Sequence, residues 1–107
     1  MSNDIRKWNI MDLKPHPRRS EFSDDLPCHL LQQLAQSMEE HGLMRPLEIL
    51  PDGTIVCGHQ RVRAAKHLGW KEIDVCVNHA LAAQGNIAIE KRMIEDNEFR
   101  RMLEDDD

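Results

Sequence analysis

The sequence predicts a single α/β (α+β) domain in which short strands are flanked by helices. Three observations predict this class. Two apolar, β-branched runs, at 54–57 and 72–77, are typical of buried strands. Apolar residues recur with helical spacing over 30–38. A strand then meets a helix directly at Gly58, which is a feature of α/β folds that bind ligands at a strand end.

The residues before the first helix predict a strand and then a loop. Alternating polar and apolar residues over 7–10 indicate a short strand, with Trp8 and Ile10 on one face. Two prolines in the 14–17 segment restrict the backbone at their own positions and at the residues before them. We therefore expect this segment to leave regular structure, and residues 18–23 to continue as a loop.

The first helix has the strongest helical pattern in the chain. Asp24 and Asp25 predict an N-terminal cap, and Pro27 suits the first helical turn. The helix is expected to end at His41, with Gly42 in a left-handed conformation. Its apolar face consists of Leu30, Leu31, Leu34, Ala35 and Met38.

A hairpin, a second helix and a third strand follow. The 46–50 segment is expected to return as 54–57 through the turn at 51–53. Gly58 ends that strand, and a helix begins at once and stops at Gly69. The expected buried residues are Val62, Ala65 and Leu68 on this helix, and Ile73, Val75 and Val77 on the 72–77 strand.

The last quarter of the chain has a weaker pattern. One or two partly docked helices are expected over 87–103, followed by a solvated acidic end at 104–107. One domain over 1–107 accounts for the whole length. The residues at helical spacing in this part are Ile87, Ile94 and Met102.

The charge distribution argues against sequence-independent DNA binding by the isolated chain. The net charge is −5, and residues 90–107 contain eight acids and four bases. The body is thus nearly neutral, and it lacks the excess of Lys and Arg that neutralises phosphates.

Cysteine usage and hydropathy indicate a reducing compartment. Cys28, Cys57 and Cys76 are odd in number and far apart, so we expect neither a disulfide framework nor a zinc ribbon, but small, mostly buried apolar residues. No apolar run approaches the roughly 20 residues that cross a bilayer, and the N-terminus lacks a signal-peptide pattern. The expected location is cytoplasmic.

The junction between strand and helix predicts an anion site. The first N–H groups of a helix have no intrahelical partners, and the helix dipole adds partial positive charge there. Gly58 lets a ligand approach the backbone closely, and Arg61 in the first turn adds a forked, charged donor. A plain connection with a solvated Arg61 is the simpler alternative. The functional alternative is a binding site for a phosphate or a carboxylate.

Several short motifs occur in order along the chain: Leu13-Lys14-Pro15-His16-Pro17-Arg18, the helix over 31–41, Gly42-Leu43-Met44-Arg45-Pro46-Leu47, Pro51-Asp52-Gly53, Gly58-His59-Gln60-Arg61-Val62-Arg63-Ala64-Ala65 and Leu68-Gly69. This ordered set resembles the N-terminal domain of ParB partition proteins and, more widely, the ParB/sulfiredoxin superfamily. The resemblance spans nearly the whole chain. It implies a small mixed sheet with flanking helices.

The resemblance implies a nucleotide site at the junction. In ParB proteins a motif there grips the phosphates of CTP, and it maps onto Gly58, His59, Gln60 and Arg61. His59 and Gln60 replace the usual Glu and Arg. The first motif adds Arg18, and Arg45 lies near a segment that the family places beside the nucleotide.

A second family motif implies a metal. It maps onto Asp96, Asn97 and Arg100, where the acid and the amide contribute to phosphate and Mg²⁺ binding. Asp96 stands in place of Glu, and a shorter carboxylate is still an oxygen ligand of the kind Mg²⁺ prefers.

The resemblance implies a regulatory module that binds a nucleotide, CTP first, in a protein of chromosome or plasmid partition or of transcription regulation. Its expected partners are the nucleotide, a second copy, and DNA through a further domain or partner. A phosphoryl-transfer enzyme or ParB-like nuclease, with His59 as candidate catalytic residue, is one alternative. A degenerate interaction domain is another. Sulfiredoxin chemistry is disfavoured, because His59 occupies the position of the reactive cysteine.

Overall fold

The computed structural model describes the backbone of residues 4–19, 25–43 and 45–104, and side chains as far as Glu95. Five strands form one sheet in the order β1-β5-β3-β4-β2. The strands are β1 (Asp4–Asn9), β2 (Lys14–Pro15), β3 (Leu47–Ile49), β4 (Thr54–Cys57) and β5 (Glu72–Val77). The helices are the 3₁₀ helix η1 (Ile10–Asp12), α2 (Cys28–His41), α3 (His59–Leu68), α4 (His79–Gln84) and α5 (Asn86–Glu104).

The sheet is mixed. β1 with β5 and β3 with β4 are antiparallel pairs, whereas β3 with β5 and β2 with β4 are parallel pairs. The predicted hairpin is the β3–β4 pair, and its turn passes through Gly53. The expected α/β class, with a small mixed sheet and flanking helices, is therefore confirmed.

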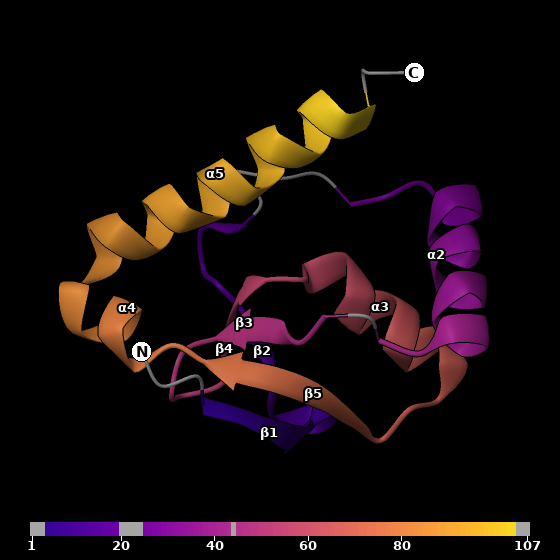
Figure 1. Cartoon of the computed structure of the whole chain (residues 1–107), viewed down its shortest axis with the longest axis horizontal. Coiled ribbons are helices and arrows are strands. Elements are labelled where there is room, and N and C mark those ends of the chain that lie inside the picture. Colours follow the sequence, from indigo (N-terminus) through magenta and orange to yellow (C-terminus); the bar gives the residue numbers. More distant parts are fainter. Residues whose placement is uncertain (1–3, 20–24, 44, 105–107) are drawn as a thin grey trace.

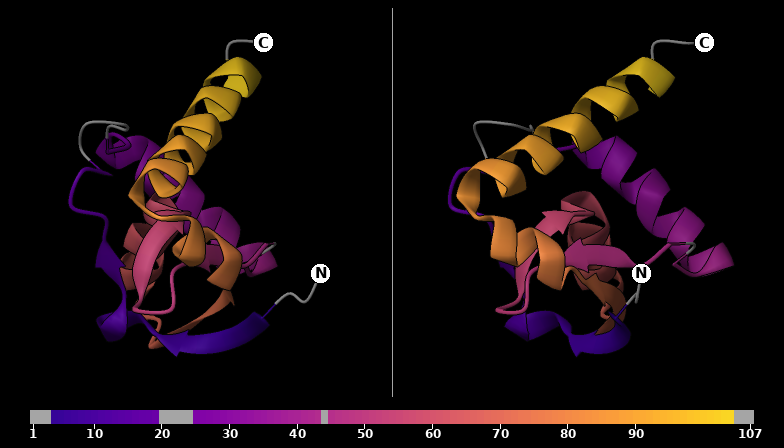
Figure 2. Two further views of the ribbon diagram at one scale, coloured as in Figure 1. Left: turned by 90° about the vertical axis from the view of Figure 1, so that its left-hand side faces the viewer. Right: turned by 60° about the vertical axis from the view of Figure 1, so that its left-hand side comes forward.

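Helices cover both faces of the sheet (Figures 1 and 2). Helices α2 and α3 pack together over the main core, which contains Ile55, Ile73 and Val75. Helices α4 and α5 cover a smaller core on the other face, which contains Val56 and Leu81. Ile55 and Val56 are consecutive residues of β4, and they enter different cores because side chains alternate across a strand.

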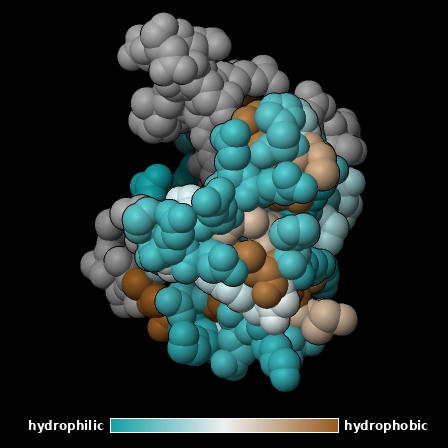
Figure 3. Space-filling model, turned by 90° about the vertical axis from the view of Figure 1, so that its right-hand side faces the viewer, coloured by the Kyte–Doolittle hydropathy of each residue, from teal (hydrophilic) through white to brown (hydrophobic). Residues whose placement is uncertain are grey.

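The face of the molecule that carries α2 is largely hydrophilic, with small separate apolar patches (Figure 3). Trp8 and Trp70 are partly buried and pack against the main core, as expected for packing residues. Among the helices of the described residues, none is long and apolar enough to cross a membrane.

The structure corrects two predictions near the N-terminus. Lys14 and Pro15 form β2 instead of leaving regular structure, and Lys14 N donates to Gly53 O at 3.1 Å. This works because β2 is an edge strand, where the missing N–H of a proline leaves no ladder partner unpaired. Ile10 is the first residue of η1 and not the end of β1, although its side chain is buried as expected.

The start of α2 is also different from the prediction. No side chain caps it, and Pro27 O accepts hydrogen bonds from Leu30 N and Leu31 N at 3.0 and 2.9 Å. Asp25 forms ion pairs instead of a cap, and Asp24 lies outside the described residues. The predicted end at His41 is confirmed, and the Gly42 N–H donates to Met38 O at 2.7 Å. Gly42 has the expected positive φ of 74°, but its ψ of −170° differs from that of a left-handed helical residue.

The docked face of α5 is not the predicted one. Ile87 is 81% exposed and Ile94 is 38% exposed, whereas Ile89 and Met93 are buried in the smaller core. A spacing of four residues places Ile89 and Met93 on one helix face. The side chain of Met102 lies outside the described residues.

Cysteine burial agrees with the prediction only in part. Cys57 is buried in the smaller core, Cys76 is half-buried, and Cys28 is exposed at the start of α2. None of these three cysteines is in a disulfide.

Candidate anion site at the start of helix α3

The candidate site is built on a direct passage from strand to helix. Strand β4 ends at Cys57, Gly58 follows in a left-handed conformation with φ 99° and ψ 21°, and α3 begins at His59. A left-handed residue turns the chain sharply, and glycine adopts it without steric cost. The first N–H groups of α3 therefore follow directly after the end of β4, and helix geometry leaves them without intrahelical partners, as in sites that bind anions.

Gly58 is required by space as well as by conformation. A Cβ built at this position would overlap Leu47 Cδ2 and lie 2.9 Å from Arg61 Nη2. Leu47 is fully buried, so its side chain has no free volume into which to move. The same distance places the guanidinium of Arg61 directly over the glycine, at the helix N-terminus.

The Arg61 side chain contacts the backbone of Arg45, another residue predicted to lie near the ligand. Arg61 Nη1 donates to Arg45 O, in the segment that leads into β3. The Arg61 guanidinium therefore holds the segment before β3 against the start of α3, and it places positive charge beside the first turn of that helix. A guanidinium presents five donors in a planar fork, a geometry that suits a phosphate.

His59 is half-buried beside the junction. Its Nδ1 is sheltered from solvent and has no hydrogen-bond partner among the described residues. Burial, followed by the positive charge of Arg19, lowers the His59 pKa from 6.5 to about 4, and Asp25 opposes this shift. The imidazole is therefore neutral at pH 7, which makes it a poor anion ligand until something compensates the nearby cations.

Acid is expected to destabilise the domain through His59. Between about pH 6.5 and pH 4 the unfolded chain binds a proton at this residue and the folded chain does not. The unfolded state then holds more protons, so the free energy of unfolding falls as the pH is lowered through this window. Allowing for solvent screening, we expect a loss of about 1–2 kcal/mol.

Urea denaturation at about pH 7 and pH 4.5 measures this loss. His59→Gln should lose less stability over the interval than the unsubstituted chain. His67→Gln, an exposed position in the last turn of the same helix, should lose as much as the unsubstituted chain. Equal losses in all three proteins would contradict the assignment to His59.

Gln60 points into the protein. It is buried, and its Oε1 accepts hydrogen bonds from Leu26 N at 3.2 Å and from Arg63 Nη1 at 2.7 Å. Its side chain therefore ties α3 to the segment before α2. The phosphate-binding role predicted for Gln60 remains a prediction. With the side chain engaged in these bonds, that role falls to the backbone N–H of Gln60 in the first turn of α3.

A network before α2 was not foreseen from the sequence. Arg19 Nη2 and Asp25 Oδ1 form an ion pair, and Arg63 Nη1 lies 3.9 Å from the same oxygen. Arg19 and Arg63 hold the pKa of Asp25 below its usual value, with the Arg19 hydrogen bond as the largest cause. The network gathers two arginines next to His59. Of the residues in this network, Asp25 alone has a local role in the sequence pattern, which predicts a helix cap there instead of an ion pair.

Arg18 contacts the C-terminal helix. Its Nη1 forms an ion pair with Glu90 Oε1 of α5, which links the loop after β2 to that helix. A second ion pair joins Arg92 of α5 to Glu48 of β3 at 3.1 Å, and Glu48 also accepts from Asn78 Nδ2 at 2.8 Å. Arg18 is exposed, but in this state its charge is engaged by the carboxylate of Glu90.

The second motif is only partly described. Asp96, Asn97 and Arg100 belong to α5, but their side chains lie outside the described residues. Among the residues whose placement is described, no group of three His, Cys, Asp or Glu side chains is arranged to hold a metal ion. The Mg²⁺ site at Asp96 therefore stays a prediction.

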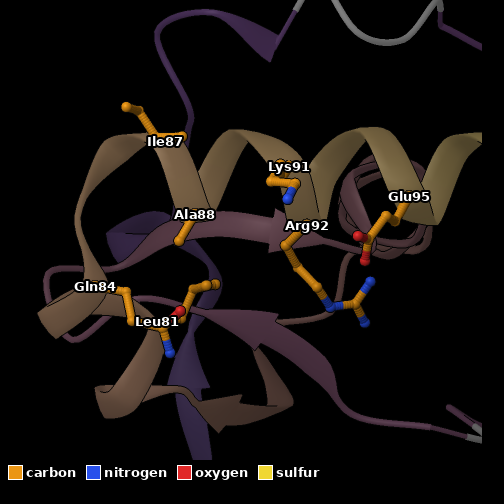
Figure 4. A pocket seen from close by; sticks show the side chains of 7 residues that line it. All are labelled: Leu81, Gln84, Ile87, Ala88, Lys91, Arg92 and Glu95. Carbon is orange, nitrogen blue, oxygen red and sulfur yellow. The ribbon is translucent and has the colours of Figure 1, made fainter.

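An open pocket of about 590 Å³ lies between α4 and α5. Its lining mixes apolar and charged side chains, and Figure 4 shows Arg92 extending toward the strands while Ile87 projects outward. It contains none of the predicted site residues. The full lining is Leu81, Gln84, Ile87, Ala88, Lys91, Arg92 and Glu95.

Fold and site together define a small α/β domain in which a strand passes through one glycine directly into a helix. The chain belongs to the ParB N-terminal domain family, whose model matches residues 1–96. This confirms the resemblance that the ordered motifs gave.

Individual relatives agree with this assignment. The chain is 36% identical over 90 residues to the probable chromosome 2-partitioning protein ParB of Deinococcus radiodurans, covering 81% of this chain and 30% of that protein. It thus spans about a third or less of the curated relatives it matches.

Solved structures show the same fold. A C-terminally truncated ParB from Caulobacter crescentus, complexed with CTP-γ-S, superposes with a TM-score of 0.70 at 26% identity, over 85% of this chain and 51% of that one. Sulfiredoxin from Arabidopsis thaliana has a TM-score of 0.57 at 22% identity, over 69% of this chain and 83% of that one. The latter likeness concerns the fold alone.

Proposed function

We propose that this chain is a nucleotide-binding regulatory module, with CTP as the first candidate ligand. Its phosphates are held at the start of α3 by the backbone N–H groups of Gly58 to Arg61 and by the guanidinium of Arg61. The observation that carries the proposal is the guanidinium of Arg61 placed over a left-handed glycine at a helix N-terminus. The Caulobacter crescentus relative complexed with CTP-γ-S supports the choice of nucleotide.

Arg18 is the second cation in this proposal. The ion pair with Glu90 already brings Arg18 to α5, the helix that carries Asp96 and Asn97. A triphosphate between α3 and α5 would meet Arg61 from one side and Arg18 from the other. Asp96 and Asn97 would hold Mg²⁺, which neutralises phosphate charge when it is bound. Arg45 contributes its carbonyl to the position of Arg61.

The partners follow from the family. We propose that DNA is contacted through a further domain or a partner, because the chain itself has a net charge of −5 and no excess of Lys and Arg. Self-association in the nucleotide-bound state is a second part of the proposal. Both belong to a role in partition of a chromosome or plasmid, or in transcription regulation.

Thermal unfolding with CTP, ATP, GTP or UTP, each with Mg²⁺, tests the nucleotide site. A ligand that binds only the folded state stabilises it by about 2.7 kcal/mol at a hundredfold excess over Kd, which is several degrees for a domain of this size. We expect a shift of this order with one nucleotide. Arg61→Ala should weaken its affinity at least about tenfold, because it removes a charge-assisted fork.

A matched control separates the site from general charge. Arg6→Ala removes the same charge from β1, whose position in the sheet is remote from β4, and it should leave the nucleotide shift unchanged. Each variant is compared with its own unfolding temperature without nucleotide, so that any loss of folding stability in Arg61→Ala does not enter the comparison. Absence of a shift with all four nucleotides would overturn the proposal and favour the interaction domain without ligand.

A further inference from the structure

The surroundings of His59 contain more cations than acids. Arg19 comes from the loop after β2, and Arg63 and Lys66 lie four and seven residues further along α3. One acid, Asp25 from the segment before α2, faces the same imidazole among the described residues. Residues at these spacings share a helix face, so the imidazole stands at the head of a basic stripe that starts at the anion site.

Asp25 only partly offsets these cations. It pairs with Arg19 and lies 3.9 Å from Arg63, and although it favours the imidazolium, burial and the three cations together outweigh it. The imidazole is therefore neutral for two physical reasons, partial burial and uncompensated positive charge. Its Nδ1 is sheltered and has no hydrogen-bond partner among the described residues, so no acceptor there favours the protonated ring.

We propose that His59 takes up a proton when an anion occupies the start of α3, so that anion binding at this site becomes stronger as the pH falls. The inference rests on the proposed nucleotide site and adds its regulation. A phosphate group at the helix N-terminus would offset the field of the cations that now disfavours the imidazolium. The imidazolium would in return attract the phosphate, because linkage makes the two effects equal.

The size of the effect depends on how far the bound anion offsets both the burial of the imidazole and the nearby cations. If the bound anion returns the His59 pKa from about 4 to a value near 6–6.5, affinity rises about fourfold to tenfold between pH 7.5 and pH 5.5. Within the residues described, the groups that face His59 are Arg19, Asp25, Arg63 and Lys66.

Calorimetric titration of the whole chain with CTP and Mg²⁺ at pH 7.5 and pH 5.5 tests the inference. The nucleotide also titrates in this range, but identically for every variant, so the comparison between proteins isolates His59. We expect the ratio of the two affinities to be about fourfold to tenfold larger for the unsubstituted chain than for His59→Gln. His67→Gln, exposed on the same helix, should keep the full ratio.

A second measurement does not depend on a variant. The imidazole Cε1–H resonance of His59 in the unsubstituted chain should titrate near pH 4 without nucleotide, and its midpoint should rise by one pH unit or more with saturating CTP. An unchanged midpoint, or equal affinity ratios in the unsubstituted chain and His59→Gln, would overturn the inference while the nucleotide site stands. Absence of CTP binding at both pH values would remove the proposed function and this inference together.

Discussion

Gly58→Ala should destabilise the domain by about 3 kcal/mol or more, because it combines backbone strain with steric overlap. The left-handed conformation at φ 99° costs an L residue roughly 1–2 kcal/mol. The new Cβ would also overlap the fully buried Leu47 and press on the guanidinium of Arg61. Since small domains are stable by only about 5–15 kcal/mol, this loss is a large fraction of the total.

The opposite end of α3 supplies the control. Gly69 also has a left-handed backbone, with φ 80° and ψ 19°, but a Cβ there would meet nothing within 4 Å. Gly69→Ala should therefore cost only the strain term, about 1 kcal/mol. Urea denaturation of both variants gives the two free energies of unfolding. Similar losses for the two substitutions would show that the close approach at Gly58 has no energetic consequence.

The same pair also separates folding from binding. Gly58→Ala should lose nucleotide stabilisation, because its methyl group displaces Arg61 from the helix start. Gly69→Ala should retain it, because its glycine lies at the far end of α3. A Gly58→Ala protein that is still folded and still stabilised by nucleotide would argue against a phosphate at this junction.

The part of the fold that the sequence predicts well is the part where local and global signals agree. The 54–57 strand is β-branched, and the glycine after it ends the strand whatever the tertiary context. The hairpin turn at Gly53 and the glycine end of α2 are likewise fixed by backbone conformation. Such features can be predicted from a single sequence because they depend on residues that are adjacent in the chain.

The docked face of α5 was misjudged because its apolar pattern is weak. Large apolar residues occur on several sides of this helix, so spacing alone does not choose among them. The smaller core selects Ile89 and Met93, which belong to the same cluster as Leu50 and Val56. Tertiary packing decides which face of α5 is buried, and the residues of the helix alone do not reveal it.

The candidate site shows the same division. Gly58 and Arg61 were placed correctly because a helix N-terminus and its first-turn arginine are local features. The burial of Gln60 and the pairing of Arg19 with Asp25 depend on the path of the loop before α2, which a single sequence does not determine. The motif alone therefore does not predict that the Gln60 side chain ties α3 to the segment before α2.

Ile89→Ala should destabilise the domain by about 2–4 kcal/mol, the usual cost of removing a buried isoleucine side chain to the β-carbon. Ile89 is 4% exposed and belongs to the smaller core with Val56, Cys57 and Leu81. Ile87→Ala is the matched control, since it is the same substitution two residues away on the same helix. Ile87 is 81% exposed, so its loss should stay within about 0.5 kcal/mol.

The reactivity of a buried thiol shows whether the stability lost in Ile89→Ala results from weaker docking of α5. Cys57 is buried beneath α4 and α5, so in a Cys28→Ser, Cys76→Ser background it is a single reporter for this face of the sheet. Ile89→Ala should raise its labelling rate at least about tenfold under native conditions, because weaker docking of α5 increases the population of locally opened states. Ile87→Ala should leave the rate unchanged. The labelling rate could instead stay unaltered in both variants while Ile89→Ala loses stability. That result would mean that α5 separates from the sheet only on global unfolding. The helix that carries Asp96 and Asn97 would then be a fixed part of the proposed site and not a movable one.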